Sequence, residues 1–121
     1  MIKRRGLLAA LLLVAARVAR ALPDELEQAR IDRLIHYVET QKRMVFVRNG
    51  KDHSCRDAAL FLRAKYAMMG EHVTTAAQFI DQIASRSSTT GEPYKVRLAD
   101  GRLLPAAKVL REELARMDRE R

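Results

Sequence analysis

The stretch from residue 44 to residue 62, "MVFVRNGKDHSCRDAALFL", holds the strand, turn and helix start on which the fold depends. Residues 44–47 are β-branched, aromatic or otherwise apolar, which favours a strand. Asn49 and Gly50 follow closely, and both tolerate the positive φ that a two-residue hairpin turn requires. Residues 51–53 are therefore predicted to return as a second short strand, so that a β-hairpin ends just before Ser54.

A helix is predicted to begin directly after this hairpin. Ser54 and Asp57 have the spacing of a capping box, with aspartate in place of the preferred glutamate. Gly70 is expected to end the helix, because glycine adopts the left-handed conformation without steric cost. The predicted apolar stripe of this helix contains Cys55, Ala58, Ala59, Leu62, Tyr66 and Met69.

A second hairpin and helix are predicted nearer the C-terminus. The alternating residues 94–98, "YKVRL", lead to Asp100-Gly101 as a second tight turn and to a return segment at about residues 102–104. Pro105 then suits the first turn of a helix, because its φ is already helical. The predicted stripe of that helix is Val109, Leu110, Leu114 and Met117.

Two further amphipathic helices complete the expected domain. Residues 23–41 carry one stripe, made of Leu26, Ile31, Leu34, Ile35 and Val38. Thr75 and Gln78 form a capping signal for a short helix that contains Phe79, Ile80, Ile83 and Ala84. We therefore predict an α+β domain in which about four helices pack on a small antiparallel sheet made from two β-hairpins.

The first residues have the layout of an export signal. Basic residues at positions 3–5 precede an apolar run over residues 6–16, and residues 19–21 form a small-x-small cleavage site. As a helix the run would span only about 17 Å, short of the roughly 30 Å hydrocarbon core of a membrane. We expect cleavage after Ala21, which leaves residues 22–121 as a single small α+β domain in the periplasm without a stable membrane span.

The route of export stays open between alternatives. The sequence "RRGLL" together with Arg17 and Arg20 partly matches a twin-arginine signal. The match is partial and the basic leader is very short, so we prefer the general secretory route. An uncleaved N-terminal anchor is the remaining alternative.

Charge and cysteine content argue against a nucleic-acid-binding protein and against a disulfide-stabilised domain. The net charge is +8, but residues 1–21 carry five positive charges and no acid, which leaves +3 for the rest of the chain. Nucleic-acid binding would want a dense basic stripe with interleaved aromatics, and we do not expect it. Because Cys55 is the sole cysteine, no intrachain disulfide can form, and the core must supply the stability.

Cys55 and His53 are weak candidates for catalysis. Cys55 follows a helix N-cap, and His53 or Arg56 would stabilise a thiolate there. However, proximity in sequence is no evidence for a catalytic pair, and a free cysteine in an apolar stripe behaves as a small hydrophobe. The three histidines lie on different segments without metal-ligand spacing. We therefore predict no metal site and no cofactor, and we lean against an enzyme.

The hydroxyl-rich loop "SRSSTTGEP", residues 85–93, is the preferred binding surface. Its hydroxyls and amides could hold an anion or a saccharide, with Tyr94 as a stacking surface and Arg97 or Lys95 as a charge partner. Alternatively, the hydroxyls satisfy backbone groups while Tyr94 packs beneath the loop. With the neighbouring turn included, the binding candidates are Arg48, Asn49, Ser87, Ser88, Thr90, Tyr94 and Arg97.

Several segments together resemble a known family. The export signal, "FVRNGKDHSC", "LRAKY", "TAAQFIDQIASRSSTTGEPYKVR" and a closing helix are similar to the YfeK-like family of small exported bacterial proteins, a domain of unknown function. The resemblance covers essentially residues 22–121. It implies a periplasmic location in a Gram-negative bacterium, and it brings no established activity, cofactor or catalytic residue.

Two hypotheses on function follow. The first is an exported periplasmic protein that binds a small ligand or another protein without catalysing a reaction, through the 85–94 loop and the neighbouring turn. The alternative is a thiol-dependent enzyme or redox-responsive protein centred on Cys55.

Overall fold

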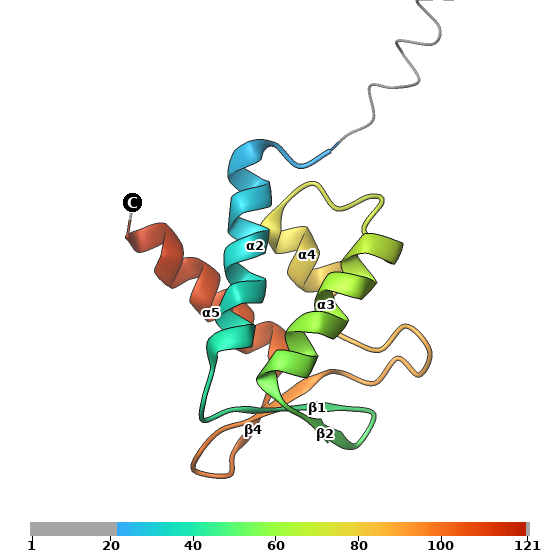
Figure 1. Ribbon diagram of the computed structural model, residues 1–121, viewed down its shortest axis with the longest axis vertical. Coiled ribbons are helices and arrows are strands. Elements are labelled where there is room, and N and C mark those ends of the chain that lie inside the picture. Colours follow the sequence, from blue (N-terminus) through green and yellow to red (C-terminus); the bar gives the residue numbers. More distant parts are fainter. Residues whose placement is uncertain (1–21, 121) are drawn as a thin grey trace, which may run out of the picture.

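The computed structural model describes residues 22–120, so the predicted signal over residues 1–21 lies outside the described residues. Figure 1 shows how the elements follow one another. In chain order they are α2 (Glu25–Thr40), β1 (Val45–Arg48), β2 (Lys51–His53), α3 (Cys55–Met69), α4 (Ala76–Gln82), β3 (Lys95–Arg97), β4 (Leu103–Pro105) and α5 (Ala106–Arg119). The described residues thus form an α+β fold, as predicted.

The two hairpins join into one antiparallel sheet with strand order β2-β1-β3-β4. Phe46 pairs with both His53 and Val96, and Val96 pairs with Leu104. Because residues paired directly across neighbouring strands point to the same face, these four side chains lie on one face of the sheet. Phe46 and Val96 are buried, so this is the face that the helices cover. Figure 1 shows the strands at one end of the helical layer.

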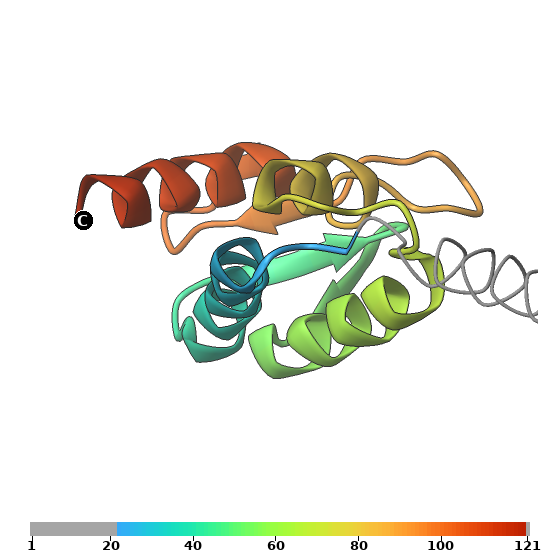
Figure 2. The same cartoon turned by 90° about the horizontal axis from the view of Figure 1, so that it is seen from above.

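The helices pack in two pairs around this arrangement. Helix α2 contacts α3, and α4 contacts α5. In the view from above, α2 and α3 lie on one side of the molecule and α4 and α5 on the other (Figure 2). Ile31, Leu34, Ile35 and Val38 of α2 are all buried, together with Phe79 and Ile80 of α4. One hydrophobic core therefore holds both pairs and the sheet together.

The backbone confirms the first predicted turn, whereas the second hairpin reverses one residue earlier than expected. Asn49 and Gly50 have φ values of 51° and 75°, so both turn residues are left-handed, as a two-residue turn between twisted strands requires. At the second hairpin the Gly101 amide donates to the Leu98 carbonyl at 2.9 Å, so Ala99 and Asp100 are the central turn residues, and Gly101 follows them with a φ of 90°. Local turn chemistry therefore determines where each hairpin reverses.

The helix starts agree with the capping predictions except in detail. The Ser54 hydroxyl accepts a hydrogen bond from the Asp57 amide at 3.1 Å, and the Thr75 hydroxyl accepts from the Gln78 amide at 3.1 Å. The Gln78 side chain reaches one residue further back than expected, because its Oε1 accepts from the amide and hydroxyl of Thr74. Pro105 is the N-cap of α5 and the last residue of β4, one position before the expected first turn.

Two helix stripes differ from the prediction at their ends. Leu26 is 53 % exposed, and Met69 is 52 % exposed, although both were expected in buried stripes. Lys65 is buried on α3 instead, with only 6 % of its surface exposed. Periodicity does not state which neighbours cover the last turn of a helix, and here a loop from residues 85–94 covers Lys65. No helix within residues 22–120 is long and apolar enough to cross a membrane.

Candidate functional site

The sheet brings the 48–50 turn and the 85–94 loop together, although they are far apart in sequence. Strand β1 runs antiparallel to β3, and Val47 pairs with Lys95. The C-terminal end of β1 therefore lies beside the residues that lead into β3. In Figure 1 the turn after β1 and the orange loop before β3 extend on the same side of the molecule. The hairpin tip at Gly101 lies at the opposite end of the sheet.

Side-chain hydrogen bonds join the turn to the loop. The Thr90 hydroxyl donates to Asn49 Oδ1 at 2.7 Å, and Asn49 Nδ2 donates to the Ser87 hydroxyl at 3.4 Å. The buried Ser87 hydroxyl also accepts from the amides of Thr89 and Thr90, each at 3.3 Å. Asn49, Ser87 and Thr90 thus hold the loop in one shape against the turn.

Tyr94 lies beneath the loop and not on its surface. Its side chain is 7 % exposed, and its ring meets the Phe61 ring edge-on, with the centroids 5.8 Å apart. The Tyr94 hydroxyl accepts a hydrogen bond from Lys65 Nζ at 3.0 Å. Tyr94 therefore packs under the hydroxyl-rich loop, as in the second of the two interpretations given above, and does not form an exposed stacking surface.

Lys65, like Phe61, belongs to this site although the sequence did not indicate it as a candidate. Its ammonium donates to the Arg86 carbonyl at 2.7 Å and to Tyr94, and it lies 4.8 Å from the centre of the Tyr94 ring. Burial, followed by the positive charge of Arg48, lowers the pKa of Lys65 below its ordinary value. The signal was available, because Lys65 falls three residues after Leu62 and so on the apolar stripe of α3.

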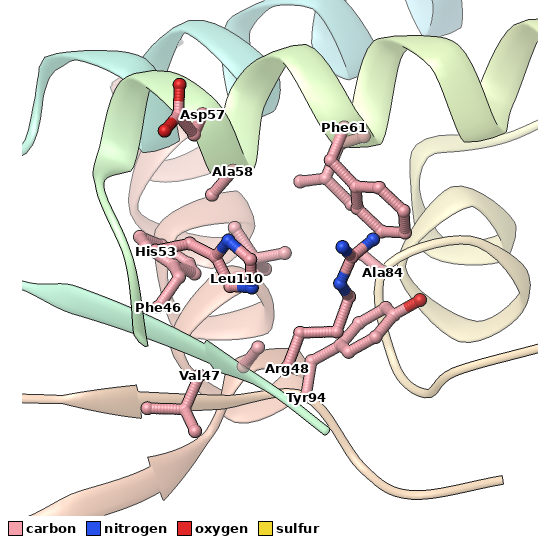
Figure 3. Close-up of a pocket in the computed structure, with 12 residues that line it drawn as sticks. Phe46, Val47, Arg48, His53, Asp57, Ala58, Phe61, Ala84, Tyr94 and Leu110 are labelled. Carbon is pink, nitrogen blue, oxygen red and sulfur yellow. The ribbon is translucent and has the colours of Figure 1, made fainter. Parts of the chain in front are cut away.

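Arg48 supplies the second positive charge. It lies two residues after Phe46 and so on the same face of the sheet, toward the helices. Its guanidinium carbon sits 3.9 Å from the centre of the Phe61 ring, a cation–π contact. Figure 3 shows the guanidinium between the side chains of Phe61 and Tyr94. Among the described residues no acidic side chain forms an ion pair with Arg48 or Lys65.

These residues line an open groove, which we call the Arg48–Lys65 groove. Its volume is about 390 Å³. Its lining includes the polar residues Arg48, Asn49, Lys65 and 87–89, and the apolar residues Phe61, Ala64, Met68 and Met69, which lie on α3 together with Lys65. The Ser88 hydroxyl connects the loop to α3 by donating to Met69 Sδ at 3.4 Å. The size falls within the range of small-molecule sites.

Arg97 does not belong to this groove. Its partner across the sheet is Val45, so it lies on the face opposite to Phe46 and Arg48. There the guanidinium donates to both carboxylate oxygens of Asp52, at 2.8 and 3.2 Å. This pair lowers the pKa of Asp52 and ties β3 to β2 across β1.

A narrow apolar pocket lies on the other side of Arg48, between α3 and the sheet. Its volume of about 40 Å³ leaves room for about one or two water molecules. Phe46, Ala58, Leu62 and Leu110 line it, and His53 lies across from Arg48 in Figure 3. His53 Nε2 is buried there without a hydrogen-bond partner among the described residues. The pocket is too small for an organic ligand in this conformation.

The structure does not bring the weak catalytic candidates together as a pair. The Cys55 thiol is buried and donates to the Met44 carbonyl at 3.0 Å, and it has no hydrogen bond to His53. Burial raises the pKa of Cys55, which disfavours the nucleophilic thiolate. Within the part of the chain that the structure describes, no cluster of three or more His, Cys, Asp or Glu side chains could hold a metal ion.

Comparison with known proteins places this small α+β chain in a family. Residues 25–118 match a "Family of unknown function (DUF5329)", and the chain belongs to that family. A relative is the "Uncharacterized protein YfeK" of Salmonella typhimurium strain LT2, which is 44 % identical over 68 residues. That match covers 56 % of this chain and 57 % of the relative, so the chain spans little more than half of the relative's length. No solved structure matches the chain.

Proposed function

We propose that the protein is an exported, non-enzymatic binding module and that it holds a ligand in the Arg48–Lys65 groove. The observation that carries the proposal is the convergence of two cationic side chains, unpaired by any acid among the described residues, at a groove of about 390 Å³. Concave sites with a few convergent polar groups are where proteins bind small molecules.

The charges at this site indicate what the groove would recognise. Burying a charged group is costly unless an opposite charge or several hydrogen bonds compensate it. Lys65 has two neutral acceptors, and Arg48 has an aromatic ring. A bound anion would supply the missing negative charge to both at once. The proposed ligand therefore carries a negative group.

A rigid rim supports binding better than a mobile loop would. The hydrogen bond between Thr90 and Asn49 connects the two segments that flank the groove. An isolated antiparallel β-bridge between Arg86 and Pro93 closes the base of the loop. A loop ordered before binding costs less conformational entropy when the ligand arrives. The same hydrogen bonds that satisfy the backbone therefore also prepare the site.

Export to the periplasm is the second part of the proposal. The basic residues, apolar run and small-x-small sequence of residues 1–21 support it. The test is to express the full chain in a Gram-negative bacterium, isolate the periplasm and weigh the protein by mass spectrometry. We expect a form that begins at Leu22. Retention of the intact chain in the cytoplasm would contradict export.

The binding proposal is tested by NMR titration of ¹⁵N-labelled residues 22–121 with a low-molecular-weight extract of periplasm. We expect amide shifts concentrated at residues 48–50 and 86–91. The Arg48→Gln variant should lose these shifts, and Arg102→Gln, which removes the same charge at the far hairpin, should keep them. Shifts that are absent, or that survive in Arg48→Gln, would refute the groove as the binding site.

A further inference from the structure

We infer that the ligand of the Arg48–Lys65 groove is an amphipathic organic anion, with its charged head at Arg48 and Lys65 and an aliphatic chain along Phe61, Ala64 and Met68. This inference rests on the proposed function and specifies the chemistry of its ligand. It follows from the lining of the groove, in which two cationic side chains lie next to apolar side chains of α3.

The head position is defined by hydrogen-bond donors that have no acceptor. An ammonium group has three N–H donors, and Lys65 uses one on the Arg86 carbonyl and one on the Tyr94 hydroxyl. The third donor remains for a ligand oxygen. The guanidinium of Arg48 presents its face to Phe61 and has no hydrogen-bond acceptor among the described residues. An oxyanion placed between these groups would accept from both.

The chain position is defined by one flank of α3. Phe61, Ala64 and Met68 are spaced i, i+3 and i+7, so they lie along one strip of the helix surface. Met68 is 83 % exposed, and Met69 beside it is half exposed. Ala64 is the smallest of the three and also lines the groove. Methionine side chains are flexible and adapt to aliphatic partners, and grouped apolar side chains at a surface mark binding sites.

Neither an inorganic anion nor a neutral apolar ligand would match all the residues that line the groove. An inorganic anion would accept hydrogen bonds from Arg48 and Lys65 but would leave the apolar strip of Phe61, Ala64 and Met68 exposed to water. A neutral apolar molecule would cover the strip but would leave both charges unpaired. An ionised head attached to an aliphatic chain matches both the cationic and the apolar residues in the same orientation.

The test uses sodium octanoate as the probe, with isothermal titration calorimetry for affinity and NMR for location. Acetate, octanol and octylammonium serve as comparison ligands, and octyl sulfate distinguishes a carboxylate requirement from a general one for anions. We expect octanoate to bind about tenfold or more tightly than each of the three comparison ligands, because it alone among these four matches both the cationic and the apolar residues. Tighter binding of octyl sulfate would assign the head to a sulfate-like group within the same inference.

Matched variants locate the head and the chain of the ligand. Arg48→Gln should weaken octanoate binding about tenfold, because it removes a positive charge from the head position. Met68→Ser should weaken binding several-fold, because it removes apolar surface that the aliphatic chain would cover. Arg102→Gln and Leu60→Ser are the controls, because Leu60 is an exposed apolar residue of the same helix outside the groove. Circular dichroism and urea unfolding check that each variant is folded. Ala64→Leu places a larger side chain at the proposed chain position and should also weaken octanoate binding.

The outcomes separate this inference from the proposed function. Octylammonium binding as tightly as octanoate, or octanoate binding no more tightly than acetate and octanol, overturns the amphipathic anion. Equal octanoate affinity in Arg48→Gln overturns the head position. If the periplasmic extract still shifts residues 48–50 and 86–91 in an Arg48-dependent manner, the proposed function stands while the inference fails.

Discussion

The buried ammonium of Lys65 is stabilised by hydrogen bonds, but no negative charge compensates it among the described residues. It lies on the buried stripe of α3, and its ammonium is held by a carbonyl and a phenol in place of a carboxylate. Such an arrangement keeps the charge hydrogen-bonded without neutralising it. Desolvation and the nearby Arg48 charge therefore both favour loss of the Lys65 proton, and they lower its pKa.

This shift predicts a pH dependence of stability. In the unfolded chain Lys65 titrates near its ordinary pKa of 10.5, and in the folded state it loses the proton at lower pH. Between the two pKa values the unfolded state binds more protons, so the free energy of unfolding rises with pH. Urea unfolding of wild type and Lys65→Met, compared from about pH 7 to about pH 10.5, should show that the stability of the wild type rises with pH relative to the variant. Parallel curves for the two proteins would contradict the prediction.

Cys55 gives a second prediction at the scale of one residue. Its thiol is buried, hydrogen-bonded to the Met44 carbonyl, and has a raised pKa. We expect slow reaction with Ellman's reagent at neutral pH in the folded protein and rapid stoichiometric reaction in denaturant, because the thiolate is scarce and shielded. Rapid reaction of the folded protein would instead support the thiol-dependent alternative.

At the scale of elements, Asn49 has two separable roles. Its backbone adopts a φ of 51° in the hairpin turn, and its side chain bonds to Ser87 and Thr90 of the loop. Asn49→Gly preserves the turn, because glycine tolerates positive φ, and removes only the side-chain contacts. We expect an unchanged β1–β2 hairpin and faster amide hydrogen exchange in residues 87–91, measured by NMR.

A control variant completes the comparison. Gly50→Ala keeps the Asn49 side chain but strains a residue whose φ is 75°, at a cost of about 1–2 kcal/mol in the free energy of unfolding. It should lower the urea midpoint with little selective effect on residues 87–91. Equal exchange of the loop in both variants would show that the Asn49 side chain does not hold it.

The elements themselves were largely predictable, because the signals for them are local. The Asn49-Gly50 turn, the hairpin that contains Asp100 and Gly101, the Ser54 and Thr75 caps and the central stripes of the helices all depend on residues a few positions apart. The errors fall at helix ends: Leu26 and Met69 are half exposed, and Gly70 ends α3 with a φ of −87° instead of the expected left-handed conformation. Burial there depends on which distant segment covers the last turn, and periodicity does not contain that information.

At the scale of the whole molecule, one core couples both helix pairs to the sheet. Leu34 of α2 is fully buried, so Leu34→Ala should lower the free energy of unfolding by about 2–5 kcal/mol, a large part of the stability of a small domain. Leu60→Ala at the surface of α3 should change it by less than about 0.5 kcal/mol. Urea denaturation of both variants measures the difference, and similar losses would argue against the assigned core.

The candidate site was only partly predictable at this scale. The sequence indicated the 85–94 loop and the neighbouring turn, and the structure places Asn49, Ser87 and Thr90 in contact. It also moves Arg97 to the opposite face of the sheet and adds Lys65 and Phe61. The antiparallel pairing of β1 with β3 produces these changes, because it determines which strand ends are neighbours and which side chains share a face.

Local sequence patterns were sufficient to predict the hairpins, the helix starts and the α+β class, since each depends on φ preferences, capping and hydrophobic period over a few residues. The position of Lys65 on α3, under the loop that follows α4 and next to Arg48 of β1, is visible only in the folded chain. Contacts between residues far apart in sequence depend on how strands pair and helices pack. The Arg48–Lys65 groove therefore exists only in the folded chain.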